Sequence, residues 1–303
     1  MTSGKLFLTR LGVTATFHPQ RAEVTDHAAT WVRRHGNFGG LAADGKVAKW
    51  KFADMVSAMY PTAPVEHAIL AANFTNWVAA VDDVFEDEPA RIGAVREAVL
   101  AGGPADETVR AFAGAWSDLE TALTSGAPPA FALRVRAALD QFFDGQAWEA
   151  RHRAAHTLPS LTDYVTHRHA NGGLPVYLRI LERSVGATGA LGAWQLALDE
   201  LAGNLTCFAH DLLSAAWDDD SDNPINLVRV MSGERGLLDH AAASRYFVDE
   251  WQRLQTLCAD TRGHSPAADA YIGSLSAFVT GVFAWMDETE RYAQPAPATV
   301  SYD

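Results

Sequence analysis

Apolar residues recur at three- and four-residue steps along almost the whole chain, which is the period of an amphipathic α-helix. Residues 104–126 show this pattern between a proline at the start and a glycine at the end, the residues that favour helix starts and stops. We find no convincing run that alternates between apolar and polar residues as a half-buried strand does. The same pattern predicts further helices over 26–35, 48–59, 65–85, 91–101, 128–156, 161–170, 174–185, 190–218, 236–258 and 266–292.

Proline, glycine and asparagine cluster where the helical pattern stops, as in "SGAPPA" and "NGGLP". None of these breaks is a low-complexity linker, and the chain shows no internal repeat. With 303 residues, of which 48% are hydrophobic, the chain can bury a full-sized core. We therefore predict one all-α domain over 1–303, with about ten to twelve helices and flexible termini near 1–15 and 294–303.

The formal net charge of −13 argues against nucleic acid or an anionic membrane as the partner, because both require clustered Lys and Arg. An acidic protein that binds an anion needs metal cations or a few well-placed arginines. Two cysteines cannot form a disulfide framework, and the N-terminal stretch lacks the apolar core of a signal peptide. No apolar run approaches the roughly 20 residues that span a bilayer, so we expect a soluble, cytoplasmic protein.

Acidic residues gather at the end of the predicted 65–85 helix, where Asp82, Asp83 and Glu86 form a D-D-x-x-E pattern. Asp82 and Glu86 are four residues apart and share a helix face, so their oxygens can bind a hard cation such as Mg²⁺. An acidic cluster of this kind is also typical of a solvated helix end.

A second polar pattern lies in "HDLLSAAWD", where His210, Ser214 and Asp218 follow one another at four-residue steps. On a helix they form one stripe about 12 Å long. The stripe is either a ligand set or the polar face of a helix next to the exposed "DDDSD" loop.

Two further patterns place arginines near breaks in the helical periodicity. Arg168 precedes a break at Asn171, Gly172 and Gly173, where glycine lets backbone carbonyls turn toward a cavity and the arginine can reach an oxyanion. Arg291 and Tyr292 end the sequence "WMDETERY" near the C-terminus, where a simple surface pair is the alternative reading.

Taken in order, these four motifs resemble those of the bacterial class I terpene cyclases, and the resemblance spans nearly the whole chain. Residues 17–36 resemble the family's N-terminal His-Pro…Trp segment. The stretch "HDLLSAAWD" resembles the second metal motif, N-D-x-x-S-x-x-x-E, and "WMDETERY" matches the closing W-x-x-x-T-x-R-Y pattern. The departures are His210 in place of Asn, Asp218 in place of Glu, and Trp217 where Lys or Arg is common.

The resemblance implies a single-domain class I terpenoid synthase fold around a central hydrophobic active-site cavity. It implies Mg²⁺-dependent ionisation of a linear prenyl diphosphate, farnesyl (C15) or geranylgeranyl (C20), and cyclisation to a terpene hydrocarbon or alcohol with release of diphosphate. Three Mg²⁺ ions are expected, with Mn²⁺ as a substitute. The prenyl diphosphate is the expected partner, without nucleic acid or membrane, and the oligomeric state is left open between monomer and homodimer.

The resemblance also implies a role for individual residues. Metal ligands are Asp82, Glu86, His210, Ser214 and Asp218; Arg168, Arg291 and Tyr292 bind the diphosphate; Asn171 and Gly172 form the break whose carbonyl faces the developing cation. Asp83 and Asp211 are expected to pair with neighbouring groups rather than to bind metal.

The wall of such a cavity must be inert and aromatic, because water quenches a carbocation and ring faces stabilise it. Candidates are Phe74, Trp77 and Trp285. Val78 and Ala79 stand just before the acidic motif, where relatives with smaller substrates often have Phe. Their small volume predicts a wide cavity that takes a C20 substrate as well as a C15 one.

Three alternatives compete with the cyclase. A chain-elongating prenyltransferase carries two D-D-x-x-D motifs, whereas the second is replaced here by "HDLLSAAWD". A degenerate cyclase would hold a prenyl diphosphate without turnover. A di-metal oxidase bundle needs two E-x-x-H pairs, and Glu149 with His152 supplies one without a second suitably placed.

Overall fold

The computed structural model describes residues 4–35, 46–85, 89–103, 105–189, 192–220, 223–233 and 237–292. Every regular element among these residues is a helix, which confirms the all-α prediction. The helices are α1 (Gly4–Arg10), α2 (Arg21–Arg34), α3 (Lys46–Trp50), α4 (Phe52–Met59), α5 (Val65–Phe85), α6 (Pro89–Ala101), α7 (Glu107–Thr124), α8 (Pro129–Ala155), α9 (Leu161–Asn171), α10 (Leu174–Ser184), α11 (Trp194–Asp220), α12 (Leu227–Ser232), α13 (His240–Thr261) and α14 (Pro266–Met286).

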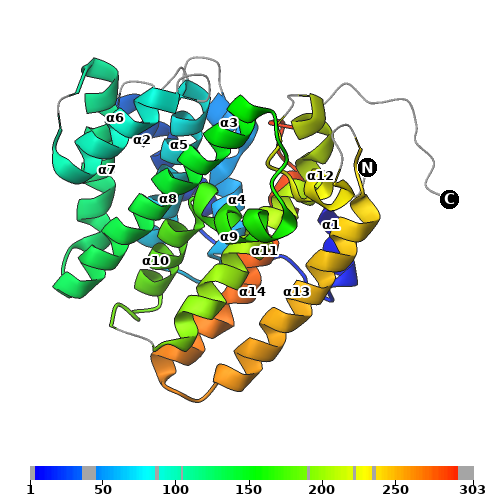
Figure 1. Ribbon diagram of the computed structural model, residues 1–303. Coiled ribbons are helices and arrows are strands. Elements are labelled where there is room, and N and C mark those ends of the chain that lie inside the picture. The colour runs from blue at the N-terminus through cyan, green and yellow to red at the C-terminus, as the bar shows by residue number, and fades with distance from the viewer. Residues whose placement is uncertain are drawn as a thin grey trace.

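The long helices form a bundle in which an inner set surrounds one cavity. Residues of α4, α5, α8, α9, α10, α11 and α14 line this cavity, and α2, α6, α7 and α13 contribute none of the lining residues. Figure 1 shows α6 and α7 on one side of the bundle and α13 on the other, with α8 to α11 between them. The cavity therefore lies at the centre of the fold, enclosed by two layers of helices.

The core behind the cavity wall is built on aromatic side chains. Trp77 and Trp116 are almost fully buried, with ring centroids 5.6 Å apart. The indole nitrogen of Trp77 donates to the carbonyl of Phe112 at 3.0 Å, so its one polar group is satisfied inside an apolar cluster. This cluster joins α5 to α7 and α8 and fixes the rotation of α5 about its axis.

The helix predicted over 48–59 is broken into α3 and α4 at Lys51, whose φ of 53° places it in the left-handed region. Apolar spacing continues through Lys51, so periodicity alone gave no sign of the break. The break frees the carbonyl of Trp50 from helical pairing. This carbonyl accepts hydrogen bonds instead from the Trp285 indole nitrogen at 2.6 Å and from the Thr289 hydroxyl at 2.9 Å.

The helix predicted over 266–292 ends at Met286, and the chain then turns back over the cavity. Asp287 accepts hydrogen bonds from the backbone N–H groups of Gly4 and Lys5, each at 2.8 Å, and so caps α1. Arg291 and Tyr292 consequently lie on a non-helical segment. The short helix α12, capped by Asn226, lies in a stretch for which no helix was predicted.

Helix α1 lies within the stretch 1–15 that the sequence predicted as a flexible end. Phe7 of α1 stacks on Phe283 of α14 at a centroid distance of 5.0 Å and is 1% exposed. Residues 294–303, the other predicted flexible end, lie outside the described residues.

Among the described helices, α14 is long and apolar enough to cross a membrane by length and composition alone, contrary to the expectation that no segment would be. However, 56% of its apolar stretch is buried inside the fold, against α4, α11 and α1. Its position is that of a core helix.

Candidate active site

The central cavity has a volume of about 540 Å³ and joins an apolar wall to a polar rim. The wall is built from Phe52, Met55, Met59, Val78, Ala79, Leu174, Ile225, Val282 and Trp285. The rim carries Asp82, Arg168, His210, Asp218, Arg291 and Tyr292, which come from four separated parts of the chain. The fold therefore brings most of the predicted metal and diphosphate residues to one rim.

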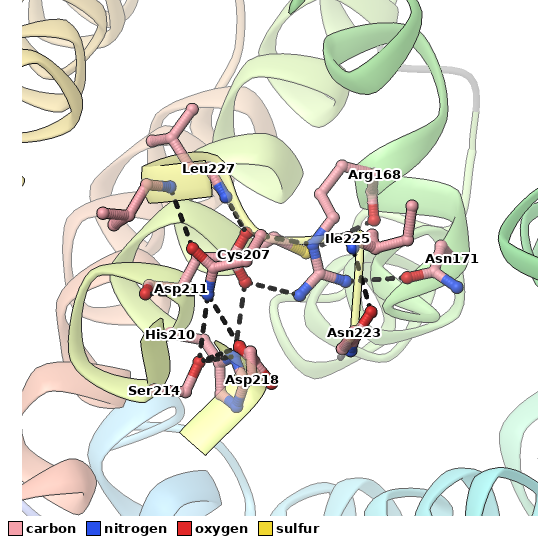
Figure 2. Close-up of polar contacts among 12 residues, drawn as sticks. Arg168, Asn171, Cys207, His210, Asp211, Ser214, Asp218, Asn223, Ile225 and Leu227 are labelled. Atoms are coloured by element: carbon pink, nitrogen blue, oxygen red, sulfur yellow. Dashed lines mark hydrogen bonds and ion pairs between the residues drawn. The ribbon is translucent and has the colours of Figure 1, made fainter. Parts of the chain in front are cut away.

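Three predicted ligands from α11 converge as their four-residue spacing requires. The Ser214 hydroxyl donates to Asp218 Oδ2 at 2.7 Å, and Ser214 Oγ lies 3.3 Å from His210 Nδ1. Figure 2 shows these side chains gathered below Asp211, and two of them, His210 and Asp218, line the cavity. Asn226 donates to the same Asp218 oxygen at 2.7 Å. Burial raises the pKa of the Asp218 carboxyl, so a nearby cation would stabilise its ionised form.

Arg168 is held by two neighbours at the end of α9. Its Nη2 lies 2.6 Å from Asp211 Oδ1, its Nε donates to Asp211 Oδ2 at 3.3 Å, and its Nη1 donates to Asn171 Oδ1 at 2.8 Å. Figure 2 shows the guanidinium between these two residues. A guanidinium has five N–H donors, so these contacts leave two for an oxyanion in the cavity.

Asp211 pairs with Arg168, a neighbouring group of the kind that the sequence analysis expected. Burial alone would raise the pKa of its carboxyl, but the Arg168 guanidinium outweighs burial and the pKa falls well below its usual range. The backbone N–H of Leu227 donates to Asp211 at 3.0 Å, and the Tyr164 hydroxyl also donates to it. Asp211 is fully buried, whereas the Arg168 side chain is 11% exposed at the cavity, and the pairing fixes the orientation of Arg168.

The predicted break between α9 and α10 lies at Gly172 and Gly173. Gly173 has a φ of 72°, which favours glycine, and Pro175 lies in the first turn of α10, where its missing N–H costs nothing. The carbonyl of Asn171 accepts from Gln146 Nε2 at 3.1 Å. That of Gly172 accepts no hydrogen bond from the described residues, and Gly172 lines the cavity. Among the described residues at the break, Gly172 is therefore the one that combines an unbonded carbonyl with a place in the cavity lining.

The C-terminal pair, Arg291 and Tyr292, supplies the remaining residues of the rim. The Tyr292 hydroxyl lies 2.7 Å from His210 Nε2 and accepts from Arg291 Nε at 3.1 Å. A tyrosine hydroxyl can accept and donate at once, so accepting from Arg291 leaves the Tyr292 proton available to His210 or to a bound anion. Burial raises the pKa of Tyr292 to about 12, so it stays a donor. The Arg291 guanidinium lies 4.0 Å above the Trp50 ring and 4.0 Å from Asp82 Oδ2.

Of the three residues of the acidic motif, Asp82 is the one whose side chain the structure describes. It lies at the cavity rim near the end of α5 and is 41% exposed. Glu86 lies outside the described residues, as does the side chain of Asp83. No group of three or more His, Cys, Asp or Glu side chains that could hold a metal occurs in the part of the chain that the structure describes.

The donor set nevertheless fits a hard cation. It combines a carboxylate, a hydroxyl and an imidazole on α11 with a carboxylate on α5, and oxygen donors are those that Mg²⁺ prefers. Metals bound by this set would supply positive charge that stabilises a leaving diphosphate. His210 is the weak member, because both of its ring nitrogens already have neighbours within hydrogen-bonding range.

The wall differs in part from the prediction. Val78, Ala79 and Trp285 line the cavity, whereas Phe74 and Trp77 do not. The lining residues of α5 are Thr75, Val78, Ala79 and Asp82, which share one helix face. Phe74 and Trp77 lie on another face and support the wall from behind.

Several lining residues were missed because they carry no motif. Phe52, Met55 and Met59 of α4 line the wall, and Gln146 and Glu149 of α8 reach the break at Asn171. The signal available in the sequence was two polar side chains, Gln146 and Glu149, three residues apart on a helix that carries many other polar residues. That pattern is shared by any solvent-facing stripe, so it did not single them out.

Comparison with known proteins identifies the family of this site. A family model described as terpene synthase family 2, C-terminal metal binding, matches residues 73–254, which is more than half of the chain. The matched range contains the acidic motif, the Arg168 stretch and the second motif.

The chain belongs to this family. It is a class I terpene cyclase, as its motifs and all-helical fold indicate. Similar proteins include bonnadiene synthase of Allokutzneria albata, 27% identical over 93% of this chain and 85% of the relative. Pristinol synthase of Streptomyces pristinaespiralis is 24% identical over 96% of this chain and 86% of that one. Germacradien-4-ol synthase from Streptomyces citricolor has a similar fold, with a TM-score of 0.70, 21% identity, and coverage of 91% and 96% of the two chains.

Proposed function

We propose that this terpene cyclase uses Mg²⁺ to ionise a linear prenyl diphosphate of C15 or C20 and cyclises the resulting cation, with release of diphosphate. The observation that supports this most directly is the central cavity, about 540 Å³, whose polar rim meets an apolar wall. A prenyl diphosphate has the same two halves. One relative, the 4-epi-cubebol synthase of Streptosporangium roseum, is named as cyclising farnesyl diphosphate.

The polar residues of the rim would bind the diphosphate end of the substrate and the metal ions. Arg168, Arg291 and Tyr292 present N–H and O–H donors where the diphosphate oxygens would lie. Asp82, Ser214 and Asp218, with His210, would hold the metal ions. At an effective dielectric constant of about 20, a unit charge pair at 4 Å contributes on the order of 4 kcal/mol, so a few such contacts can dominate ionisation.

The wall protects and guides the cation. Phe52 and Trp285 present rings to the cavity, and a ring face stabilises a nearby cation by about 0.5 to 2 kcal/mol. The side chains of Met55, Met59 and Val282 carry no oxygen that could attack a carbocation. Enclosure by helices keeps bulk water away from the intermediate.

The decisive experiment is incubation of the purified protein and Mg²⁺ with the C10, C15 and C20 diphosphates. We expect diphosphate release together with cyclic products detected by gas chromatography and mass spectrometry. Binding without diphosphate release would indicate a degenerate cyclase. Formation of a longer diphosphate after addition of isopentenyl diphosphate would indicate a chain-elongating prenyltransferase.

The width of the cavity at Val78 and Ala79 should set the chain length of the substrate. Introducing Phe at both positions adds two rings to a face that lines the cavity, so preference should shift toward the shorter diphosphate. The measurement is kcat/KM for the C10, C15 and C20 diphosphates. Val78→Ala, which enlarges the same place, should not favour the shorter substrate. Unchanged selectivity in the Phe variant would show that the prenyl chain does not reach this face.

His210 should make the binding of Mg²⁺ weaker than an Asn would. An imidazole prefers softer ions than Mg²⁺, and His210 Nε2 is already engaged by Tyr292. We expect His210→Asn to lower the Mg²⁺ concentration for half-maximal activity and to reduce any advantage of Mn²⁺ over Mg²⁺. The exposed His27→Asn on α2 is the matched control. Superimposable metal titrations of His210→Asn and wild type would eliminate His210 as a ligand.

A further inference from the structure

Helix α8 contacts the break between α9 and α10 at one residue, Asn171, through three close contacts. Gly145 brings the backbones so close that a Cβ there would lie 2.3 Å from the Asn171 nitrogen. Gln146 donates to the Asn171 carbonyl at 3.1 Å, and the Asn171 side-chain amide donates to Glu149 Oε2 at 2.6 Å. The three contacts come from the same face of α8 and none involves a metal ligand.

The side-chain amide of Asn171 has a fixed polarity. Its oxygen accepts from Arg168 Nη1 at 2.8 Å, and its nitrogen donates to Glu149. A flipped amide would point N–H at a guanidinium and oxygen at a carboxylate, so both contacts would be lost. Asn171 is 4% exposed and Glu149 8% exposed, so water offers neither group an easy replacement.

The carboxylate of Glu149 is itself anchored. Its other oxygen, Oε1, accepts from Arg153 Nε at 2.8 Å, one turn further along α8. Glu149 and Arg153 both lie at the cavity surface together with Arg168 and Asn171. The result is a continuous chain from Arg153 through Glu149, Asn171 and Arg168 to Asp211, in which each donor meets an acceptor.

We infer that Glu149 is a positioning residue for the reaction: by orienting the Asn171 amide it aims the two remaining N–H donors of Arg168 at the diphosphate. The inference rests on the proposed role of Arg168 as a diphosphate contact. Glu149 does not touch the diphosphate in this arrangement. It acts through Asn171, and its effect should appear where the transition state is stabilised rather than where the substrate is first bound.

A charge swap tests this coupling. Asn171→Asp alone sets a second carboxylate against Glu149 in a buried site, where like charges oppose each other. We expect kcat to fall about 100-fold, as for loss of a donor aimed at the transition state, with a smaller change in KM. The double variant Glu149→Gln/Asn171→Asp restores a donor facing an acceptor at each contact and keeps one negative charge. It should recover kcat at least about tenfold over Asn171→Asp.

Asp144→Asn is the matched control, because Asp144 is an exposed carboxylate on the same helix that pairs with Arg96; its kinetics should equal those of wild type. A double variant no faster than Asn171→Asp would overturn the inference. The proposed function fails separately, if Arg168→Lys has normal kinetics or if wild type forms no cyclic product.

Alanine variants cover the case in which Asn171→Asp does not fold. Glu149→Ala should lower kcat at least about tenfold in the wild-type background and have little further effect in an Asn171→Ala background, because the coupled residues act as a unit. The ratio of cyclic to acyclic products, measured in the same reactions, should fall in parallel with kcat. Additive effects of the two alanine substitutions would overturn the inference, since they would show that Glu149 acts independently of Asn171.

Discussion

Replacing Arg168 with lysine should lower kcat about 100- to 1000-fold, the loss typical of removing an aimed donor from a preorganised site. Arg168 binds Asp211 with two nitrogens and Asn171 with a third, and still has donors for a phosphate oxygen. An ammonium group has three donors on a single atom and cannot span these partners at once. The measurement is kcat and KM with the preferred diphosphate at saturating Mg²⁺.

The lysine variant isolates geometry from charge. It keeps a cation beside the buried Asp211, so the large penalty of an unpaired buried carboxylate is avoided and the helical fold should persist in circular dichroism. Arg136→Lys is the control, because Arg136 also binds a carboxylate with two nitrogens but lies on the surface, against Glu120. Near-normal kinetics of Arg168→Lys would show that another residue contacts the diphosphate.

Replacing Asp82 with asparagine should remove most activity while leaving the fold intact. The substitution preserves volume but deletes a negative charge at the rim, where a metal-bound diphosphate must be held. Metal stabilisation is worth several kcal/mol, and each 1.36 kcal/mol is tenfold in rate, so a loss of roughly 100-fold or more is expected. Asp82 is 41% exposed and 4.0 Å from the nearest Arg291 nitrogen, which is beyond hydrogen-bonding distance, so the loss of its charge should cost the fold little.

Metal dependence distinguishes this outcome from simple damage. If Asp82 binds metal, Asp82→Asn should also need a higher Mg²⁺ concentration for half-maximal activity. Asp118→Asn on α7, an exposed carboxylate beside His35, is the control and should match wild type in both measurements. Wild-type turnover by Asp82→Asn would remove this residue from the metal site.

Which residues share one face of a helix could be predicted from the sequence, because a helix has one fixed period. His210, Ser214 and Asp218 share a stripe wherever α11 lies, and their donor atoms do converge. The break after Arg168 was equally local, since Gly173 and Pro175 favour it whatever surrounds them. The breaks at Lys51 and Met286 were not predicted, because contacts with Trp285, Gly4 and Lys5 from distant parts of the chain accompany them.

What the sequence by itself determined is the helical class, the order of the motifs and the donor types on each helix. Which face of α5 lines the cavity was decided by tertiary packing, because Trp77 bonds Phe112 and turns Val78 and Ala79 inward. Packing of α8 on α9 likewise brought Glu149 to Asn171, 22 residues away in the chain. Helix rotation and helix pairing depend on many weak contacts summed over the whole core, and no short stretch of sequence contains that sum.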